Sequence, residues 1–152
     1  MNRRLLIAVA AAGSAALLLG AFAFEHLGGL APCKLCIWQR YPHAVALALG
    51  LIAYFFPLSA LILLGALAAF ATAGVGLYHV GVEQSWWQGP TSCSVAPLGD
   101  IDSEELFDQI MAAPLVRCDD IAWQLAGLSM AGWNMLVSLL LAVIWISAWR
   151  KA

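Results

Sequence analysis

The feature that most constrains this chain is a set of long apolar runs without charged side chains. Residues 5–24 and 58–78 contain no Asp, Glu, Lys or Arg, and residues 125–149 are interrupted only by small polar residues and Asn134. A helix needs about 20 mostly apolar residues to cross the hydrocarbon core of a bilayer. These runs therefore predict membrane-spanning helices.

A shorter apolar run lies between the first two. Residues 44–56 reach spanning length only if the helix starts near residue 37, and it then contains Arg40 and Pro42. Proline disfavours the helical conformation of the residue before it, so we expect a kink or break after Arg40. Four spans follow, at about residues 5–24, 37–56, 58–78 and 125–149.

Composition supports the membrane assignment. Hydrophobic residues make up 63% of the chain and charged residues 11%, whereas soluble domains carry about 25% charged residues. The mean hydropathy is +0.87. These values exclude a water-soluble globule and a disordered chain. With a net charge of -2 and no basic stripe, we expect no nucleic-acid partner.

Positive charges set the orientation. Arg3 and Arg4 precede the first span, and Arg150 and Lys151 follow the fourth, so the positive-inside rule puts both termini in the cytoplasm. The first run resembles a signal peptide, but its apolar stretch exceeds the usual 7–15 residues, and we expect a retained helix. The predicted fold is an all-α integral membrane protein of one domain, residues 1–152. It is a four-helix transmembrane bundle with a short first outer loop (25–36) and a long second one (79–124).

The second outer loop contains a candidate short helix. Ser103 is a plausible N-cap, Glu104 and Glu105 follow in the first turn, and Pro114 ends the segment. Such a helix could lie flat on the membrane surface or pack on the bundle as an ordinary loop helix, and its periodicity fits both.

All four cysteines are predicted to lie outside the membrane core on the non-cytoplasmic side. Cys33 and Cys36 fall in the first outer loop, and Cys93 and Cys118 fall in the second. This placement indicates an oxidising compartment, where disulfides persist. For Cys93 and Cys118, a structural bridge and an exchanging pair both fit the sequence.

The Cys33–Cys36 spacing is CxxC, which several chemistries use. Covalent haem attachment needs a histidine next, where Ile37 stands. A structural zinc site needs a second closely spaced pair, so we expect no metal. A redox-active dithiol needs only the two thiols, and Pro32 before Cys33 indicates a helix start, which lowers a thiol pKa.

Arg40 lies four residues after Cys36, on the same face of a helix. Its guanidinium could stabilise a Cys36 thiolate and donate a hydrogen bond to a carbonyl oxygen of a ligand. Alternatively, Arg40 extends to the lipid headgroups and has no other role.

Several motifs together resemble the DsbB family, the disulfide bond formation proteins B. Residues 32–40, PCKLCIWQR, resemble the motif that opens the second helix of that family. Residues 76–79 with Glu83 are similar to its third helix end, and Cys93 and Cys118 stand where its second cysteine pair does. Residues 118–123 and 127–134 resemble its entry into the fourth helix. The resemblance covers nearly the whole chain.

The resemblance implies a thiol:quinone oxidoreductase of the bacterial inner membrane. In such a protein a DsbA-like periplasmic thioredoxin-fold partner attacks Cys93 of a Cys93–Cys118 disulfide. Freed Cys118 then attacks Cys33, and released Cys36 reacts with a quinone, ubiquinone or menaquinone, near Arg40.

His79 is a candidate second contact of the quinone, or only a polar residue at the membrane interface. Two other classes compete with this reading. One is a membrane scaffold with two permanent disulfides, whose CxxC would not react with a reduced partner. The other is the vitamin K epoxide reductase family, in which the CxxC lies near later helices than here.

Overall fold

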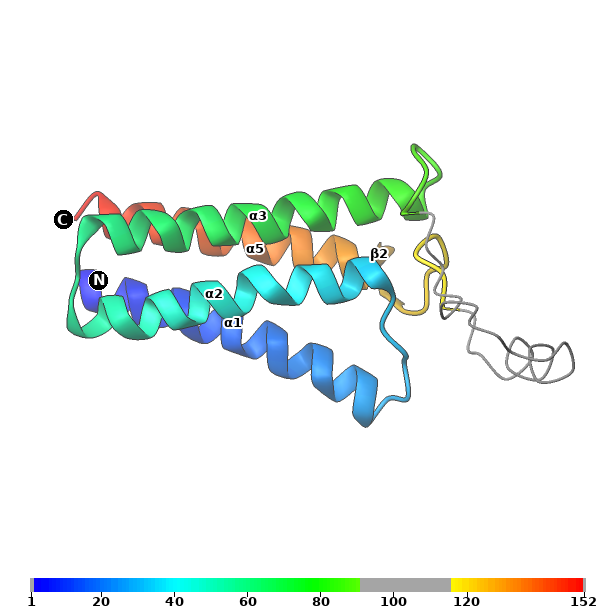
Figure 1. Ribbon diagram of the computed structural model, residues 1–152, viewed down its shortest axis with the longest axis horizontal. Helices are drawn as coiled ribbons and strands as arrows, with labels where there is room; N and C mark the ends of the chain where they lie inside the picture. Colours follow the sequence, from blue (N-terminus) through cyan, green and yellow to red (C-terminus); the bar gives the residue numbers. More distant parts are fainter. Residues whose placement is uncertain (1, 91–115, 152) are drawn as a thin grey trace, which may run out of the picture.

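The computed structural model describes residues 2–90 and 116–151. Within these residues four long helices form a bundle: α1 (Arg3–His26), α2 (Lys34–Phe55), α3 (Ser59–Glu83) and α5 (Met130–Trp149). Each of α1 and α3 packs against both α2 and α5. Both chain ends lie at one end of the bundle, and the first turn of α2 lies at the other (Figure 1). The predicted helical bundle is confirmed.

Three helices have the length and apolar character needed to cross a membrane: α1, α3 and α5. Helix α2 has 22 residues, but its first turns contain Lys34, Gln39, Arg40 and His43. The spanning role of α2 therefore remains a prediction.

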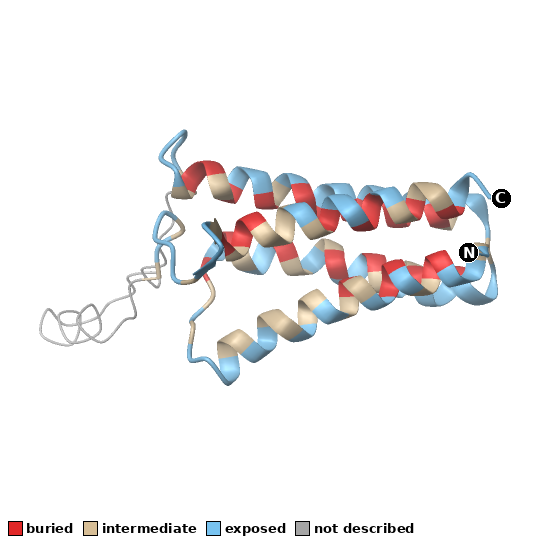
Figure 2. Ribbon diagram, turned by 180° about the vertical axis from the view of Figure 1, so that it is seen from behind, coloured by how far each residue is buried: buried red, intermediate tan, exposed pale blue. Residues whose placement is uncertain are grey.

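The bundle centre is packed through small residues. Ala10, Ala53, Ala69 and Ala142 are fully buried, and they allow the helix backbones to approach closely, as in other membrane bundles. The fully buried indole of Trp145 fills the remaining space. Many large apolar side chains, for example Leu19 of α1 and Leu67 of α3, are exposed on the outside of the bundle. The exposed residues of each helix form its outer face (Figure 2).

Three helix ends differ from the prediction by three residues or more. Helix α2 begins at Lys34 and not at residue 37, so Cys36 lies in its first turn and not in the loop. Helix α3 continues past residue 78 to Glu83, so His79 lies on a helix and not in a loop. Helix α5 begins at Met130 and not at residue 125, because a short hairpin precedes it, made of β1 (Gln124–Leu125) and β2 (Leu128–Ser129). Its two turn residues, Ala126 and Gly127, both have positive φ, the geometry of a two-residue hairpin turn.

Of the predicted kink or break near Pro42, the break is wrong, because α2 runs without interruption from Lys34 to Phe55. A proline removes a backbone donor and disturbs the carbonyls of the preceding turn. In this chain the hydroxyl of Thr72 on α3 donates to the carbonyl of Gln39 at 3.1 Å. A neighbouring side chain thus satisfies the disturbed turn, which is how membrane helices tolerate proline.

Two sequence predictions fall outside the described residues. They are the acidic helix near Ser103 and the position of Cys93.

Candidate functional site

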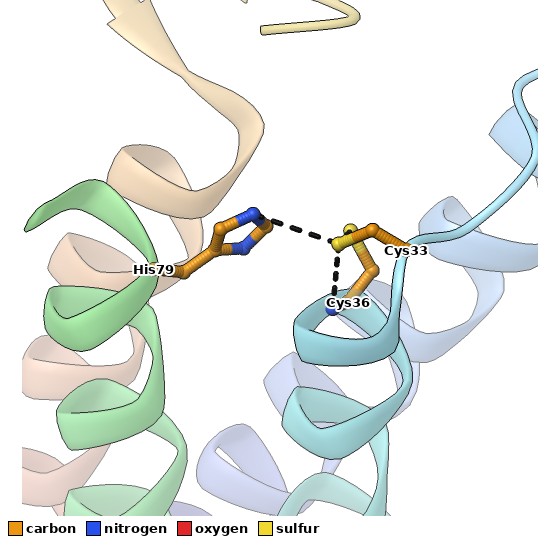
Figure 3. Close-up of side chains that lie close together, drawn as sticks. All are labelled: Cys33, Cys36 and His79. Carbon is orange, nitrogen blue, oxygen red and sulfur yellow. Dashed lines mark hydrogen bonds between the residues drawn. The ribbon is translucent and has the colours of Figure 1, made fainter. Parts of the chain in front are cut away.

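The CxxC motif forms the N-terminus of α2. Cys33 is the N-cap with extended backbone angles, and its sulfur accepts a hydrogen bond from the Cys36 backbone N–H at 3.2 Å. The two Sγ atoms are 2.8 Å apart, with Cys33 donating to Cys36, and both cysteines are free thiols (Figure 3). The predicted helix start after Pro32 is confirmed, and the two sulfurs are close enough to form a disulfide after a small shift.

The two thiols differ in acidity. The hydrogen bond from Cys33 is the largest cause that lowers the pKa of Cys36, from an ordinary value of 9.0 to about 7, with a smaller contribution from Arg40. Burial and the Glu83 carboxylate oppose this shift. The same sulfur–sulfur hydrogen bond, together with burial, raises the pKa of Cys33. Cys36, in the first turn of α2 and before the predicted span, is therefore the sulfur that ionises first.

His79 approaches the dithiol from α3. Its Nε2 lies 3.6 Å from the Cys33 sulfur, and the side chain is buried (Figure 3). Gln39 Nε2 donates to the Leu35 carbonyl at 3.1 Å and lies 3.0 Å from His79 Nδ1. Since that amide nitrogen is a donor, Nδ1 accepts, and the imidazole proton is on Nε2, facing the sulfur.

Glu83 closes the outer side of this cluster. Its Oε1 lies 3.8 Å from His79 Nε2, and its other carboxylate oxygen accepts a hydrogen bond from the Ser129 hydroxyl, just before α5. The side chain is 5% exposed. Glu83, which the resemblance places at the end of the third helix, is thus a buried carboxylate next to His79.

A buried polar network continues from Gln39 toward the bundle centre. Asn134 on α5 donates to Gln39 Oε1 at 2.7 Å and to Thr72 Oγ1 at 3.2 Å. Its Oδ1 lies 2.9 Å from Nε2 of His43. Asn134, the polar residue inside the last apolar run, therefore makes hydrogen bonds between helices, and the network joins α2, α3 and α5.

Arg40 is turned toward α1. It forms an ion pair with Glu25 at 2.5 Å, and its guanidinium lies 4.9 Å from the centre of the Phe22 ring. Its Nε is buried and has no hydrogen-bond partner among the described residues. A buried donor without a partner is uncommon in folded proteins and calls for an explanation such as a ligand.

A cavity of about 360 Å³ lies beside the dithiol and is lined by residues of α1, α2, α3 and α5. Its polar lining includes Cys33, Cys36, Arg40, His79 and Glu83, and most of the lining residues from α1, the hairpin and α5 are apolar. This volume and this mixture of side chains are typical of small-molecule sites.

Cys118 belongs to the same region. It packs, half-buried, against a small apolar cluster that contains Cys33 and Val82. Of the residues predicted from the sequence, the structure therefore brings together Cys33, Cys36, Cys118 and His79, and it puts Arg40 on the adjoining cavity wall.

Sequence reasoning missed the residues that support the site. Gln39 lies inside the CxxC-to-arginine motif, so its helical position could have indicated a role. The contact between Glu25 and Arg40 could have been suspected only from the two opposite charges near the same membrane boundary. The contacts of His43 depend on the packing of α5 and leave no signal in the sequence.

A thiol pair at a helix N-terminus, next to a buried imidazole and a third cysteine, is a candidate thiol–disulfide redox centre. Three helices of the bundle that carries it are long and apolar enough to cross a membrane. Comparison with known proteins agrees. The family model for the disulfide bond formation protein DsbB matches residues 3–148, and the chain belongs to the DsbB family.

The relatives cover most of the chain. The disulfide bond formation protein B of Pasteurella multocida is 32% identical over 91% of this chain and 84% of its own. The protein of the same name from Verminephrobacter eiseniae is 36% identical over 93% and 82%. No solved structure matches the chain. Membership implies disulfide bond formation, an oxidoreductase role.

Proposed function

We propose that the protein is a membrane thiol:quinone oxidoreductase that reoxidises a periplasmic, DsbA-like thioredoxin-fold dithiol and so sustains protein disulfide formation. The observation that carries this proposal is that three cysteines lie close together and that two of them, Cys33 and Cys36, line one cavity. Cys118 packs beside Cys33, and Cys36 opens onto the cavity that Arg40 also lines.

The cavity fits a quinone ring in size and chemistry. Its apolar lining suits the ring, and the unpartnered Nε of Arg40 is a donor for a ring carbonyl. The low pKa of Cys36 provides a thiolate at neutral pH in the same cavity. A bound quinone would supply the electron acceptor, taking two electrons and two protons and leaving as quinol.

The sulfurs pass the electron pair by successive thiol–disulfide exchange. A partner thiolate attacks Cys93 of the Cys93–Cys118 disulfide, and Cys118 leaves as a thiolate. Cys118 then attacks Cys33 of the Cys33–Cys36 disulfide, and Cys36 leaves as the thiolate that faces the cavity. The partner's second thiol releases the oxidised partner and frees Cys93, which restores the Cys93–Cys118 bond.

The cycle ends when Cys33, freed by that step, closes the disulfide with Cys36. In balance, one partner dithiol becomes a disulfide and one quinone becomes quinol. The His79 Nε2–H lies 3.6 Å from the Cys33 sulfur, so it can stabilise Cys33 as an anion each time this sulfur is the leaving group.

The proposed membrane placement follows from the same arrangement. Helix α2 is the fourth span in the bacterial inner membrane, with both termini cytoplasmic and the cysteines periplasmic. In support, the chain ends and the CxxC lie at opposite ends of the bundle (Figure 1), and the basic residues Arg3, Arg4, Arg150 and Lys151 gather at the end with the termini.

Turnover with a reduced DsbA-like protein and a water-soluble ubiquinone analogue tests the function. Cys36→Ser should abolish quinone reduction and leave the Cys93–Cys118 disulfide able to form a mixed disulfide with the partner. Leu19→Ala, on the exposed face of α1, is the matched control and should turn over normally. A Cys36→Ser protein that reduces quinone at the control rate would overturn the proposal.

Arg40→His tests the quinone contact separately. The KM for quinone should rise about tenfold, the equivalent of one charge-assisted hydrogen bond worth about 1.5 kcal/mol, while the KM for the partner stays the same. An unchanged quinone KM would return Arg40 to a role at the lipid headgroups.

A further inference from the structure

We propose that the reduced dithiol and His79 form a binding site for a thiophilic divalent cation, Zn²⁺ or Cd²⁺, which exists only while Cys33 and Cys36 are reduced. The Cys33 and Cys36 sulfurs and a ring nitrogen of His79 all lie within 4.8 Å of one another (Figure 3). The inference rests on this geometry and on the thiol chemistry of the proposed function, and it does not depend on quinone.

The ligand set suits zinc. Two thiolates and one imidazole are ligands that zinc prefers, with Zn–S near 2.3 Å and Zn–N near 2.0–2.1 Å, so neighbouring ligands in a tetrahedral site stand roughly 3.6 Å apart. The Cys33 Sγ to His79 Nε2 distance is 3.6 Å. The two sulfurs, at 2.8 Å, must separate by about 1 Å. Half-buried Cys36 borders the cavity and has room to move.

The fourth position of such a site faces the cavity. Oε1 of Glu83 lies 3.8 Å from the same nitrogen of His79, which is close to the separation of two ligands on one metal ion. A carboxylate or a water molecule can occupy this position. The site therefore resembles three-ligand zinc sites that keep one place open.

Gln39 supplies the support that a metal-binding histidine needs. To bind a cation, Nε2 must lose its proton, and Nδ1 must then carry one and donate it. The Gln39 amide lies 3.0 Å from Nδ1, and a half-turn of this amide presents its oxygen there. The turn breaks the hydrogen bonds that Gln39 makes with the Leu35 carbonyl and with Asn134, and the new hydrogen bond from Nδ1 partly offsets their loss.

Binding is gated by the redox state. The cation displaces two thiol protons to solvent and transfers no electrons, whereas the Cys33–Cys36 disulfide has no thiolate to offer. A bound cation therefore holds the pair in the dithiol state and blocks its reoxidation. Zinc or cadmium in the periplasm would thus inhibit disulfide formation at this step.

Zinc affinity of the purified full-length protein tests the site. In a Cys93→Ser/Cys118→Ser background, the reduced protein in lipid nanodiscs is titrated against a chromophoric zinc chelator. We expect one Zn²⁺ per protein, and His79→Ala should weaken binding at least tenfold. His26→Ala, at the exposed end of α1, is the control and should bind as the parent does. The oxidised protein should bind none.

Two further measurements test the zinc site without relying on His79→Ala, in case that variant folds poorly. Gln39→Glu leaves all three ligands in place and offers Nδ1 a stronger acceptor, so it should tighten zinc binding severalfold. Cd²⁺ should produce the ultraviolet absorption of cadmium–thiolate bonds in the reduced protein only. Equal affinity in His79→Ala, a folded Gln39→Glu variant and the parent would overturn the site, as would zinc binding to the oxidised protein.

These outcomes are separable from those of the proposed function. A parent protein that reduces quinone in chelator-treated buffer but binds no Zn²⁺ when reduced would overturn only the zinc site. Failure of quinone reduction with zinc binding retained would overturn only the redox assignment.

Discussion

Replacing Cys33 by alanine removes the thiol that donates to Cys36, which is the largest cause of the low pKa at Cys36. A shift from 9.0 to about 7 corresponds to roughly 2.7 kcal/mol of thiolate stabilisation. In Cys33→Ala, the backbone hydrogen bond of residue 33, Arg40 and the helix N-terminus still favour the thiolate, so the pKa should rise by about one to two units and not further. Cys33→Ser keeps a hydroxyl donor and should shift the pKa much less.

The assay is the pH dependence of Cys36 alkylation by iodoacetamide in a Cys93→Ser/Cys118→Ser background. The rate at one pH is a poor readout, because a thiolate of higher pKa is also more nucleophilic, with a Brønsted slope of about 0.4–0.5. The midpoint of the profile avoids this problem. With Cys33 present, the rate should fall as pH drops through about 7, since the thiolate is lost there. Cys33→Ala should move this midpoint to about 8–9. A midpoint near 9 with Cys33 present would refute the reasoning.

Two further predictions concern the bundle itself. Asn134→Leu leaves the Gln39 amide oxygen without its donor and should lower the free energy of unfolding by about 1–3 kcal/mol, measured by denaturant titration in detergent. Unchanged stability would show that water replaces Asn134. Gly65→Ala would put a Cβ 2.7 Å from the Trp145 ring and should cost about 1–3 kcal/mol. Gly74→Ala meets nothing within 4 Å and serves as its control; equal stability of the two would contradict the packing.

Hydropathy predicted the helices, and the cysteine motif predicted the centre of the site. Each prediction succeeded because the feature it concerns depends on residues that are neighbours in the sequence. The apolar runs located α1, α3 and α5, and Pro32 located the start of α2. The end of α3 was predicted too early because the apolar run stops at residue 78, whereas packing against Ser129 and Cys33 keeps His79 and Glu83 helical.

Contacts between distant residues could not be predicted in this way. Asn134 and Gln39 are 95 positions apart, and only the packing of α5 on α2 brings them together. Likewise, Thr72 of α3 and the Gln39 carbonyl in the turn before Pro42 are 33 positions apart, and their hydrogen bond depends on the packing of α3 on α2. The exchange between Cys93 and Cys118 stays a prediction, since Cys93 lies outside the described residues.

A single turnover without oxygen tests the central claim most directly. The Cys93→Ser/Cys118→Ser protein is reduced, freed of reductant and mixed anaerobically with a ubiquinone analogue, and quinone absorbance and free thiols are followed together. We predict that one quinone is reduced for each Cys33–Cys36 dithiol that becomes a disulfide. Quinone that stays oxidised while both thiols remain titratable would contradict the account.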